Sequence, residues 1–433
     1  MRNLLRSAGV ALLVALQTQT ALAATHAATP LSLNTAIALA LRDNLAYRSA
    51  QIGIAQAVAQ LRQAHAPELP GLALRDTYLY ASPVAKLTTP FGSIPFSSTD
   101  STNVPLLALQ YTLYDGGVTA ARVGQAAAGL SMAEGDAHEA RGATVAQVSK
   151  AYFGLLAAMR MERVAQHALT LAGQHVKQAR ELLAGGQIPR ADLLRAQAGL
   201  ADQNVRAIQA HDAVAMAQLA LAQVLHAPLS TRYMPTDRLA GSVPHFDLRA
   251  LLASARAQRG EYLAAKAALV AAQRAVAVAR GGAAPSVALT VADGNTQPAV
   301  ISGFHNQFSV GLSAVWMLFD GGYTAGRVAA ARAGVQRAKL GVEGLREAIG
   351  VQVRSAYLGV QAAQAGVSAA RQFVHYADES LRLAGVRYHG GVATALEMQD
   401  AQQRDRAAHQ ELVHAEAALR TSIVELRFAA GLL

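Results

Sequence analysis

The chain has 433 residues, of which 52% are hydrophobic, 5% aromatic and 15% charged, and its formal net charge is +10. It contains no cysteine, which excludes disulfide bonds, thiolate metal sites, a cysteine nucleophile and a lipidated N-terminal cysteine. A basic chain can bind nucleic acid, but here the arginines are scattered singly along predicted helices and form no dense run. We therefore expect no nucleic-acid partner.

The N-terminus has the three-part pattern of a secretory signal peptide. Arg2 and Arg6 precede an apolar run over residues 8–16, and Ala21–Ala23 offers an A-x-A cleavage site. The run is too short for a membrane-spanning helix, which needs roughly 20 apolar residues, and we identify no later uninterrupted stretch of that length. The pattern predicts a signal peptide over residues 1–23 and a mature protein that leaves the cytoplasm.

The rest of the sequence is an internal repeat. The sequence Leu-Tyr-Asp-Gly-Gly at 113–117 recurs as Leu-Phe-Asp-Gly-Gly at 318–322, an offset of 205 residues that continues without gaps into the helices that follow. Upstream of these motifs the offset is 215, so the first copy carries ten extra residues between Pro70 and Leu113, in a loop region. The pattern predicts a first repeat over 24–226, a proline-containing connector over 227–247 and a second repeat over 248–433.

Each repeat begins with one predicted helix, over 33–63 and 248–280, that proline or glycine ends. Two strands follow, in which apolar residues alternate with small or polar ones. The strands cover residues 72–80, 107–113, 287–291 and 308–318. Such alternation over about ten residues is typical of transmembrane β-strands with one face to lipid and the other to a wet lumen. Tyrosine and tryptophan near the strand ends favour the membrane over the alternative, a soluble hairpin with one buried face.

A long proline-free stretch follows the second strand of each repeat. Residues 118–183 predict a helix of about 100 Å, which is too long for an ordinary globular domain. Its apolar residues step by three and four, as in a coiled-coil seam. They are Val145, Val148, Tyr152, Leu155 and Met159. A second helix returns over 191–225, and the copy repeats the pattern over 327–388 and 396–427. We expect two long antiparallel helical pairs in each chain.

Four strands are too few to close a barrel, and open sheet edges are not tolerated in lipid. Two copies would give eight strands, whose interior side chains nearly fill, whereas three copies give twelve strands and room for a channel. We therefore predict a mixed α and β fold. In a homotrimer its four transmembrane strands per subunit close a 12-stranded β-barrel, and its helical pairs form an α-barrel.

The ordered motifs resemble the TolC-type outer-membrane efflux protein family over essentially all of the mature sequence. The resemblance rests on the two turns at Tyr114–Gly117 and Phe319–Gly322 and on the two helix-tip motifs at Gly186–Leu193 and Gly391–Met398. It implies a trimeric channel in the bacterial outer membrane that extends into the periplasm. The channel would dock on a periplasmic adaptor and an inner-membrane transporter, in tripartite efflux or type I secretion. It would passively conduct drugs, ions or proteins and require no cofactor.

The resemblance also assigns residues to three sites. The periplasmic gate comprises Glu397, Asp400, Asp192 and Tyr388. The adaptor-docking tips comprise Gly185, Gly186, Gln187, Ile188, Gly390, Gly391, Val392 and Ala393. The strand-to-helix turns comprise Asp115, Gly116, Gly117, Asp320, Gly321 and Gly322. Three copies of Glu397 and Asp400 would ring a narrow opening and attract cations, the alternative being a solvated helix face. Ala393 occupies the position where some members carry a basic latch residue, and Arg190 is a candidate substitute.

No motif in the sequence indicates catalysis. There is no HExxH motif, no P-loop and no Gly-x-Ser-x-Gly elbow. Thirteen histidines are present, but the pairs His167/His175 and His409/His414 are not at the i, i+4 spacing that presents two ligands together. We therefore expect no metal site, no cofactor and no enzyme activity. The alternative to a channel is a soluble periplasmic coiled-coil scaffold.

Overall fold

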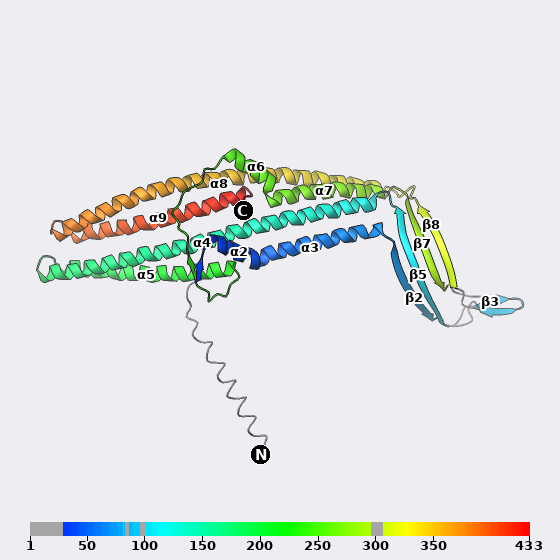
Figure 1. Cartoon of the computed structure of the whole chain (residues 1–433), viewed down its shortest axis with the longest axis horizontal. Coiled ribbons are helices and arrows are strands. Elements are labelled where there is room, and N and C mark those ends of the chain that lie inside the picture. Colours follow the sequence, from blue (N-terminus) through cyan, green and yellow to red (C-terminus); the bar gives the residue numbers. More distant parts are fainter. Residues whose placement is uncertain (1–28, 81, 83–85, 96–100, 296–305) are drawn as a thin grey trace, which may run out of the picture. The chain divides into compact units, whose positions relative to one another are not determined.

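The computed structural model describes residues 29–80, 82, 86–95, 101–295 and 306–433 (Figure 1). The predicted signal peptide, residues 1–23, lies outside them. The chain forms two compact units. The helical unit comprises Met1–Arg48, Ala140–Ala255 and Gly350–Leu433, and the sheet unit comprises Ser49–Glu139 and Arg256–Ile349. Each unit draws on both halves of the chain, and the repeat boundaries at 226 and 248 stay a prediction.

The sheet unit contains one four-stranded antiparallel sheet (Figure 1). Its strands are β2 (Gly71–Tyr80), β5 (Ser101–Tyr114), β7 (Ser286–Asn295) and β8 (Asn306–Val315), in the order β2-β5-β7-β8. All four were predicted, but β8 ends at Val315 and not at residue 318. The reason is that Val315 pairs with Ser286, the first residue of β7, and the preceding Pro285 has no N–H to extend the ladder. The two edges of the sheet, β2 and β8, have no partner strand among the described residues.

The ten extra residues of the first repeat form a feature that the sequence did not predict. Twenty residues separate β2 from β5, against ten between β7 and β8, and the longer connection contains the hairpin β3 (Lys86–Thr89) and β4 (Gly92–Pro95). Gly92 has a φ of +130° at its turn, and the hydroxyl of Thr89 donates to the carbonyl of Gly92 at 2.7 Å. The insertion therefore lies in the predicted loop region.

The strand register separates two chemically different faces. One face carries apolar rows that cross all four strands, such as the row Leu72, Leu109, Val291 and Val310. The other face carries small or polar rows, such as Ala73, Ala108, Ala292 and Ser309. On the apolar face the exposed fractions of Leu72, Leu74, Phe308, Val310 and Leu312 are 61–75%. The hairpins therefore do not lie in a dry protein interior, and this face suits lipid.

The helix that opens each repeat is broken, where a single helix was predicted. The first consists of α2 (Leu33–Asp43) and α3 (Leu45–His65), followed by the turn η1 (Ala66–Glu68), and the second of α6 (Leu248–Gln258) and α7 (Gly260–Gly281). The breaks fall at Asn44 and Arg259, whose ψ values are 124° and 121°. The Asn44 side chain accepts from the N–H of Tyr47 at 3.1 Å, and the buried Arg259 guanidinium lies 2.9 Å from Glu261. The Asn44 side chain thus satisfies a backbone N–H in the first turn of α3, whereas the Arg259 ion pair links two side chains at the start of α7.

Helix α7 passes the length and composition test for a membrane span, unlike every other helix in the described ranges. It is not an uninterrupted apolar stretch, because Glu261, Lys266, Arg274 and Arg280 lie within it. Its first residue nevertheless packs on α4, because a Cβ added to Gly260 would lie only 2.2 Å from the carbonyl oxygen of Gly135. We therefore treat α7 as a packed helix of the sheet unit.

The predicted long helical pairs are present in both repeats. Helices α4 (Val118–Ala184) and α8 (Tyr323–His389) each have 67 residues, and α5 (Arg190–Val224) and α9 (Ala395–Ala429) each have 35. Val176 and Ala179 of α4 pack against Ala196 of α5. Helices α8 and α9 are linked by side-chain contacts between Asp378 and His409 and between Arg387 and Glu397. The pairs are therefore antiparallel, as expected.

The core of the helical unit forms around the predicted seam of α4. Val148, Tyr152 and Leu155 are completely buried and pack with Leu221 of α5. The Tyr152 hydroxyl lies 2.6 Å from Asp237 Oδ2 and 2.9 Å from the carbonyl oxygen of Leu31. Leu31 ends β1 (Thr29–Leu31), which pairs in parallel with β6 (Tyr233–Pro235). The predicted proline-containing connector therefore contains an ordered strand fixed to the core.

Candidate functional site

The two strand-to-helix turns have the same hydrogen-bonded geometry. Asp115 Oδ1 and Oδ2 accept from the N–H groups of Gly117 and Thr119 at 3.0 and 2.6 Å. Asp320 accepts from Gly322 and Thr324 at 3.0 and 2.7 Å. Each aspartate thus satisfies free N–H groups at the start of a 67-residue helix. The two glycines of each turn have φ values between +63° and +89°, a region that favours glycine.

The same hydrogen bonds stabilise the ionised form of both aspartates. The hydroxyl and N–H of Thr324 lower the pKa of Asp320 below its ordinary value. Burial acts in the opposite direction on Asp115, but hydrogen bonds from Thr119 and Gly117 outweigh it and its pKa is also lowered. Both carboxylates are therefore ionised caps at the positive ends of the helix dipoles. These contacts explain why the Asp-Gly-Gly motif is repeated.

The two helix tips also share one turn geometry. Gly186 and Gly391 have φ values of +69° and +71°. At the first tip the N–H of Gln187 donates to Leu182, and at the second the N–H of Val392 donates to Arg387, both at 2.9 Å. This is a glycine C-cap that satisfies the last carbonyls of α4 and α8. Ile188 packs against the buried cluster of Val176, Ala179 and Ala196, whereas Val392 is 73% exposed.

The predicted gate carboxylates lie near the start of α9, and each has an arginine partner. Thr394 caps the helix, its hydroxyl accepting from the N–H of Glu397 at 3.2 Å. The Glu397 carboxylate pairs with Arg387 of α8, and Asp400 pairs with Arg404 at 2.9 Å. Both pairs are solvent-exposed, so each contributes about 0–1 kcal/mol. Sequence reasoning missed Arg387, because nothing in the pattern indicates a pair across the turn.

Asp192 and Tyr388, the other predicted gate residues, are close to each other without a hydrogen bond. Asp192 pairs with Arg195 at 2.7 Å. Tyr388 is 3% exposed, and its ring lies 5.2 Å from that of His175. Burial raises the pKa of Tyr388, and the charge of Asp192 raises it further.

Arg190, the candidate substitute latch, makes no ion pair within the described part of the chain.

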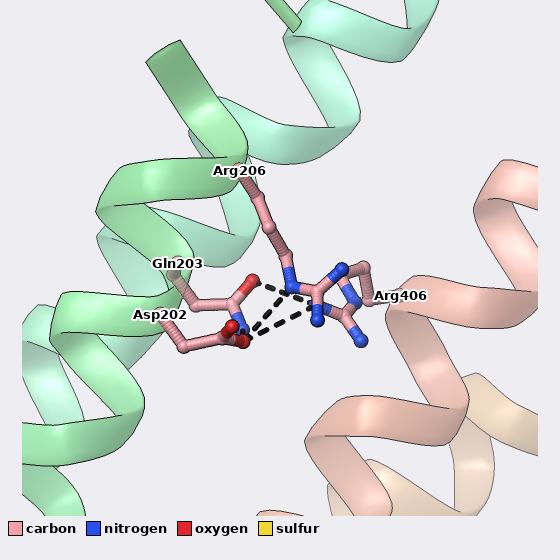
Figure 2. A network of polar contacts seen from close by, with 4 residues as sticks. All are labelled: Asp202, Gln203, Arg206 and Arg406. Atoms are coloured by element: carbon pink, nitrogen blue, oxygen red, sulfur yellow. Dashed lines mark hydrogen bonds and ion pairs between the residues drawn. The ribbon is translucent and has the colours of Figure 1, made fainter. Parts of the chain in front are cut away.

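Close to the helix tips, a groove with a volume of about 270 Å³ lies between α4, α5 and α9. Its polar lining includes Gln399, Gln402 and Gln403. At this level a network joins α5 to α9 (Figure 2). Arg406 donates to Gln203 Oε1 at 3.1 Å, and Arg206 donates to Asp202 Oδ2 at 2.9 Å. The contact fixes the second helix of one pair to that of the other.

A sheet with one apolar face and two open edges, joined to long capped helical pairs, defines the chain as a subunit of an outer-membrane channel. The chain belongs to the Outer membrane efflux protein family, whose sequence profile matches residues 36–226 and 251–432. The expected family resemblance is thereby confirmed.

The chain is also similar to individual proteins in sequence and in structure. Protein CyaE of Bordetella pertussis is 29% identical over 410 residues, which cover 93% of this chain and 84% of CyaE. The outer membrane protein VceC from Vibrio cholerae is 22% identical with a TM-score of 0.77, over 92% of this chain and 96% of VceC. The outer-membrane channel OprN is 21% identical with a TM-score of 0.77, over 92% and 89% of the two chains. The two solved structures share the fold of this chain.

Family membership decides between the two functions weighed from the sequence. The chain is an outer-membrane channel subunit of an export system that extends into the periplasm, and not a soluble scaffold. The family works as trimers with a periplasmic adaptor and an inner-membrane pump. It consists of channel proteins rather than enzymes.

Proposed function

We propose that three copies of the chain close a 12-stranded barrel and conduct cargo passively, without catalysing a reaction. The observation that supports this is the pair of open sheet edges at β2 and β8. Unpaired backbone N–H and C=O groups cost several kcal/mol each in lipid, so the edges of one subunit must pair with those of its neighbours. Twelve strands leave a lumen that eight would nearly fill.

We further propose that the small and polar sheet face lines this lumen, while the apolar face contacts outer-membrane lipid. The helix tips at Gly185–Ile188 and Gly390–Ala393 dock the periplasmic adaptor. Support comes from the rigid glycine C-caps at both tips and from the exposed Val392, which offers apolar area to a partner. The second tip thus presents a stronger apolar contact than the first, where Ile188 packs inward.

The periplasmic gate is proposed to comprise Glu397, Asp400, Asp192 and Tyr388. In a trimer, Glu397 and Asp400 would supply six carboxylates to one opening. Their exposed arginine pairs are weak enough to exchange without a large cost in free energy. The pair between Arg387 and Glu397 links α8 to α9 across the tip, and we propose it as a weak, reversible counterpart of the basic latch that is absent at Ala393.

Replacing Asp400 by alanine is expected to weaken the cation selectivity of the channel. The substitution removes three carboxylates from the proposed ring, so the local potential becomes less negative and cation block decreases. The measurement is the reversal potential of the trimer in planar bilayers under a salt gradient, together with titration of a blocking divalent cation. Glu411→Ala, on the same helix, is the matched control, because Glu411 is an exposed carboxylate beyond the proposed gate. Equal selectivity in the wild type and Asp400→Ala would remove Asp400 from the gate.

A further inference from the structure

Three metal-ligating side chains meet where α8 packs on α9 in the helical unit. Asp405 and His409 lie one turn apart on α9, and Asp378 faces them from α8. His409 Nε2 lies 3.0 Å from Asp378 Oδ1 and 3.8 Å from Asp405 Oδ1. One oxygen or nitrogen of each residue lies within 4.8 Å of those of the other two. Our search for histidine pairs missed this group, because Asp405 and His409 do have the i, i+4 spacing but only one is a histidine.

The spacing of these atoms suits a tetrahedral metal ion. Zinc binds nitrogen and carboxylate oxygen at about 2.0–2.2 Å, so neighbouring ligand atoms in a tetrahedral site lie about 3.3 Å apart. The 3.0 and 3.8 Å separations around His409 bracket that value. The third separation, between the oxygens of Asp378 and Asp405, is within 4.8 Å, and Asp378 is half-exposed.

The charge of the group also favours a bound cation. Asp405 is 6% exposed, and its carboxylate faces that of Asp378. Two carboxylates that share a partly desolvated site repel each other unless a cation or a proton compensates them. A divalent ion would neutralise the two carboxylates without protonating either.

The surroundings leave room for a further ligand. A cavity of about 360 Å³ is lined by Asp405, by His409 and by His167 of α4. Arg163 and Arg406 also line it, but neither pairs with Asp378 or Asp405 among the ion pairs of the described residues. The cavity can therefore admit water to the fourth coordination position.

We propose that Asp378, Asp405 and His409 bind a divalent transition-metal ion of the zinc type. One imidazole and two carboxylates form a nitrogen and oxygen donor set that suits zinc and similar ions. Because the ligands come from α8 and α9, the ion would crosslink the second helical pair. The site is independent of the proposed gate residues and of the conducted cargo.

Cobalt is the probe for this site, because tetrahedral Co²⁺ absorbs visible light strongly and Zn²⁺ does not. Tag-free trimer is stripped with chelator and titrated with Co²⁺ at neutral pH, followed by competition with Zn²⁺. The expected result is one Co²⁺ per chain with a tetrahedral spectrum, and its loss on adding Zn²⁺. Absence of saturable binding, or binding with a fully hydrated octahedral spectrum, would overturn the proposal.

Variants separate this site from adventitious surface binding. His409→Ala removes a direct ligand and Asp378→Asn removes the charge of one, so each is expected to weaken Co²⁺ binding by at least the roughly 10–100-fold that loss of an outer-shell partner costs. His414→Ala removes an exposed histidine of the same helix and is expected to bind as the wild type does. Size exclusion confirms that each variant is a trimer. If His409→Ala fails to assemble, Asp378→Asn still tests the site, because Asp378 is half-exposed and the amide has nearly the same shape as the carboxylate. Equal affinity in wild type and Asp378→Asn would refute the site.

Discussion

Val310→Arg is expected to destabilise the membrane-inserted protein by about 2–4 kcal/mol per chain, the cost of a cation on the lipid face near the middle of a membrane strand. Val310 is the fifth of the ten residues of β8, and it lies in an apolar row that continues through Val291, Leu109 and Leu72. An arginine there would have no polar partner in this row.

The neighbouring position provides the control. Ser309 points to the other face, in a row with Ala292, Ala108 and Ala73. Ser309→Arg places the same charge at nearly the same depth, but in the proposed lumen, and is expected to change conductance with little loss of stability. The measurement is the fraction of folded trimer recovered in lipid vesicles over a urea series. A larger loss for Ser309→Arg than for Val310→Arg would reverse the assignment of the two faces.

Gly260→Ala is expected to destabilise the protein by about 1–3 kcal/mol, because it overpacks a contact between two backbones. The added Cβ would lie 2.2 Å from Gly135 O and 2.5 Å from the backbone nitrogen of Glu139. Neither atom can rotate away as the end of a side chain can, so α7 and α4 must separate. The thermal midpoint of the detergent-solubilised trimer measures the effect.

Gly129→Ala is the matched substitution on α4, since no atom lies within 4 Å of the added Cβ. It is expected to leave the midpoint unchanged or to raise it, because alanine favours the helix by roughly 0.5–1 kcal/mol over glycine. If Gly260→Ala raised the midpoint as much as Gly129→Ala, the close approach of α4 and α7 would be wrong.

Local periodicity made most of the fold predictable. The strands were found because alternation with period two is a property of consecutive residues, and the pairing of Val310 with Val291 confirms the faces it implied. The seam residues Val148, Tyr152 and Leu155 were likewise identified from steps of three and four, and all are buried. The Asp115 and Asp320 caps recur because each long helix needs an acceptor for its first N–H groups.

Most of the features that were missed depend on contacts between distant segments. The breaks at Asn44 and Arg259 are different, because their contacts with Tyr47 and Glu261 are local and the helical pattern around them conceals the breaks. Strand β6 forms only because it pairs with β1, about two hundred residues earlier. The partnership of Arg387 with Glu397 and that of His409 with Asp378 each require two helices to pack in one register. Sequence spacing along one helix cannot show these pairs.

The proposal that neighbouring chains seal the sheet is tested most directly by joining β2 of one chain to β8 of the next. The chain has no cysteine, so introduced thiols are the only ones that can react. Leu74→Cys in β2 is combined in turn with a cysteine at Phe308, Val310 or Leu312 of β8, all on the apolar face. After oxidation in the outer membrane, at least one pair is expected to give a covalent ladder that stops at three chains. Bonds confined within single chains, or a ladder that continues beyond three, would contradict a closed trimeric barrel.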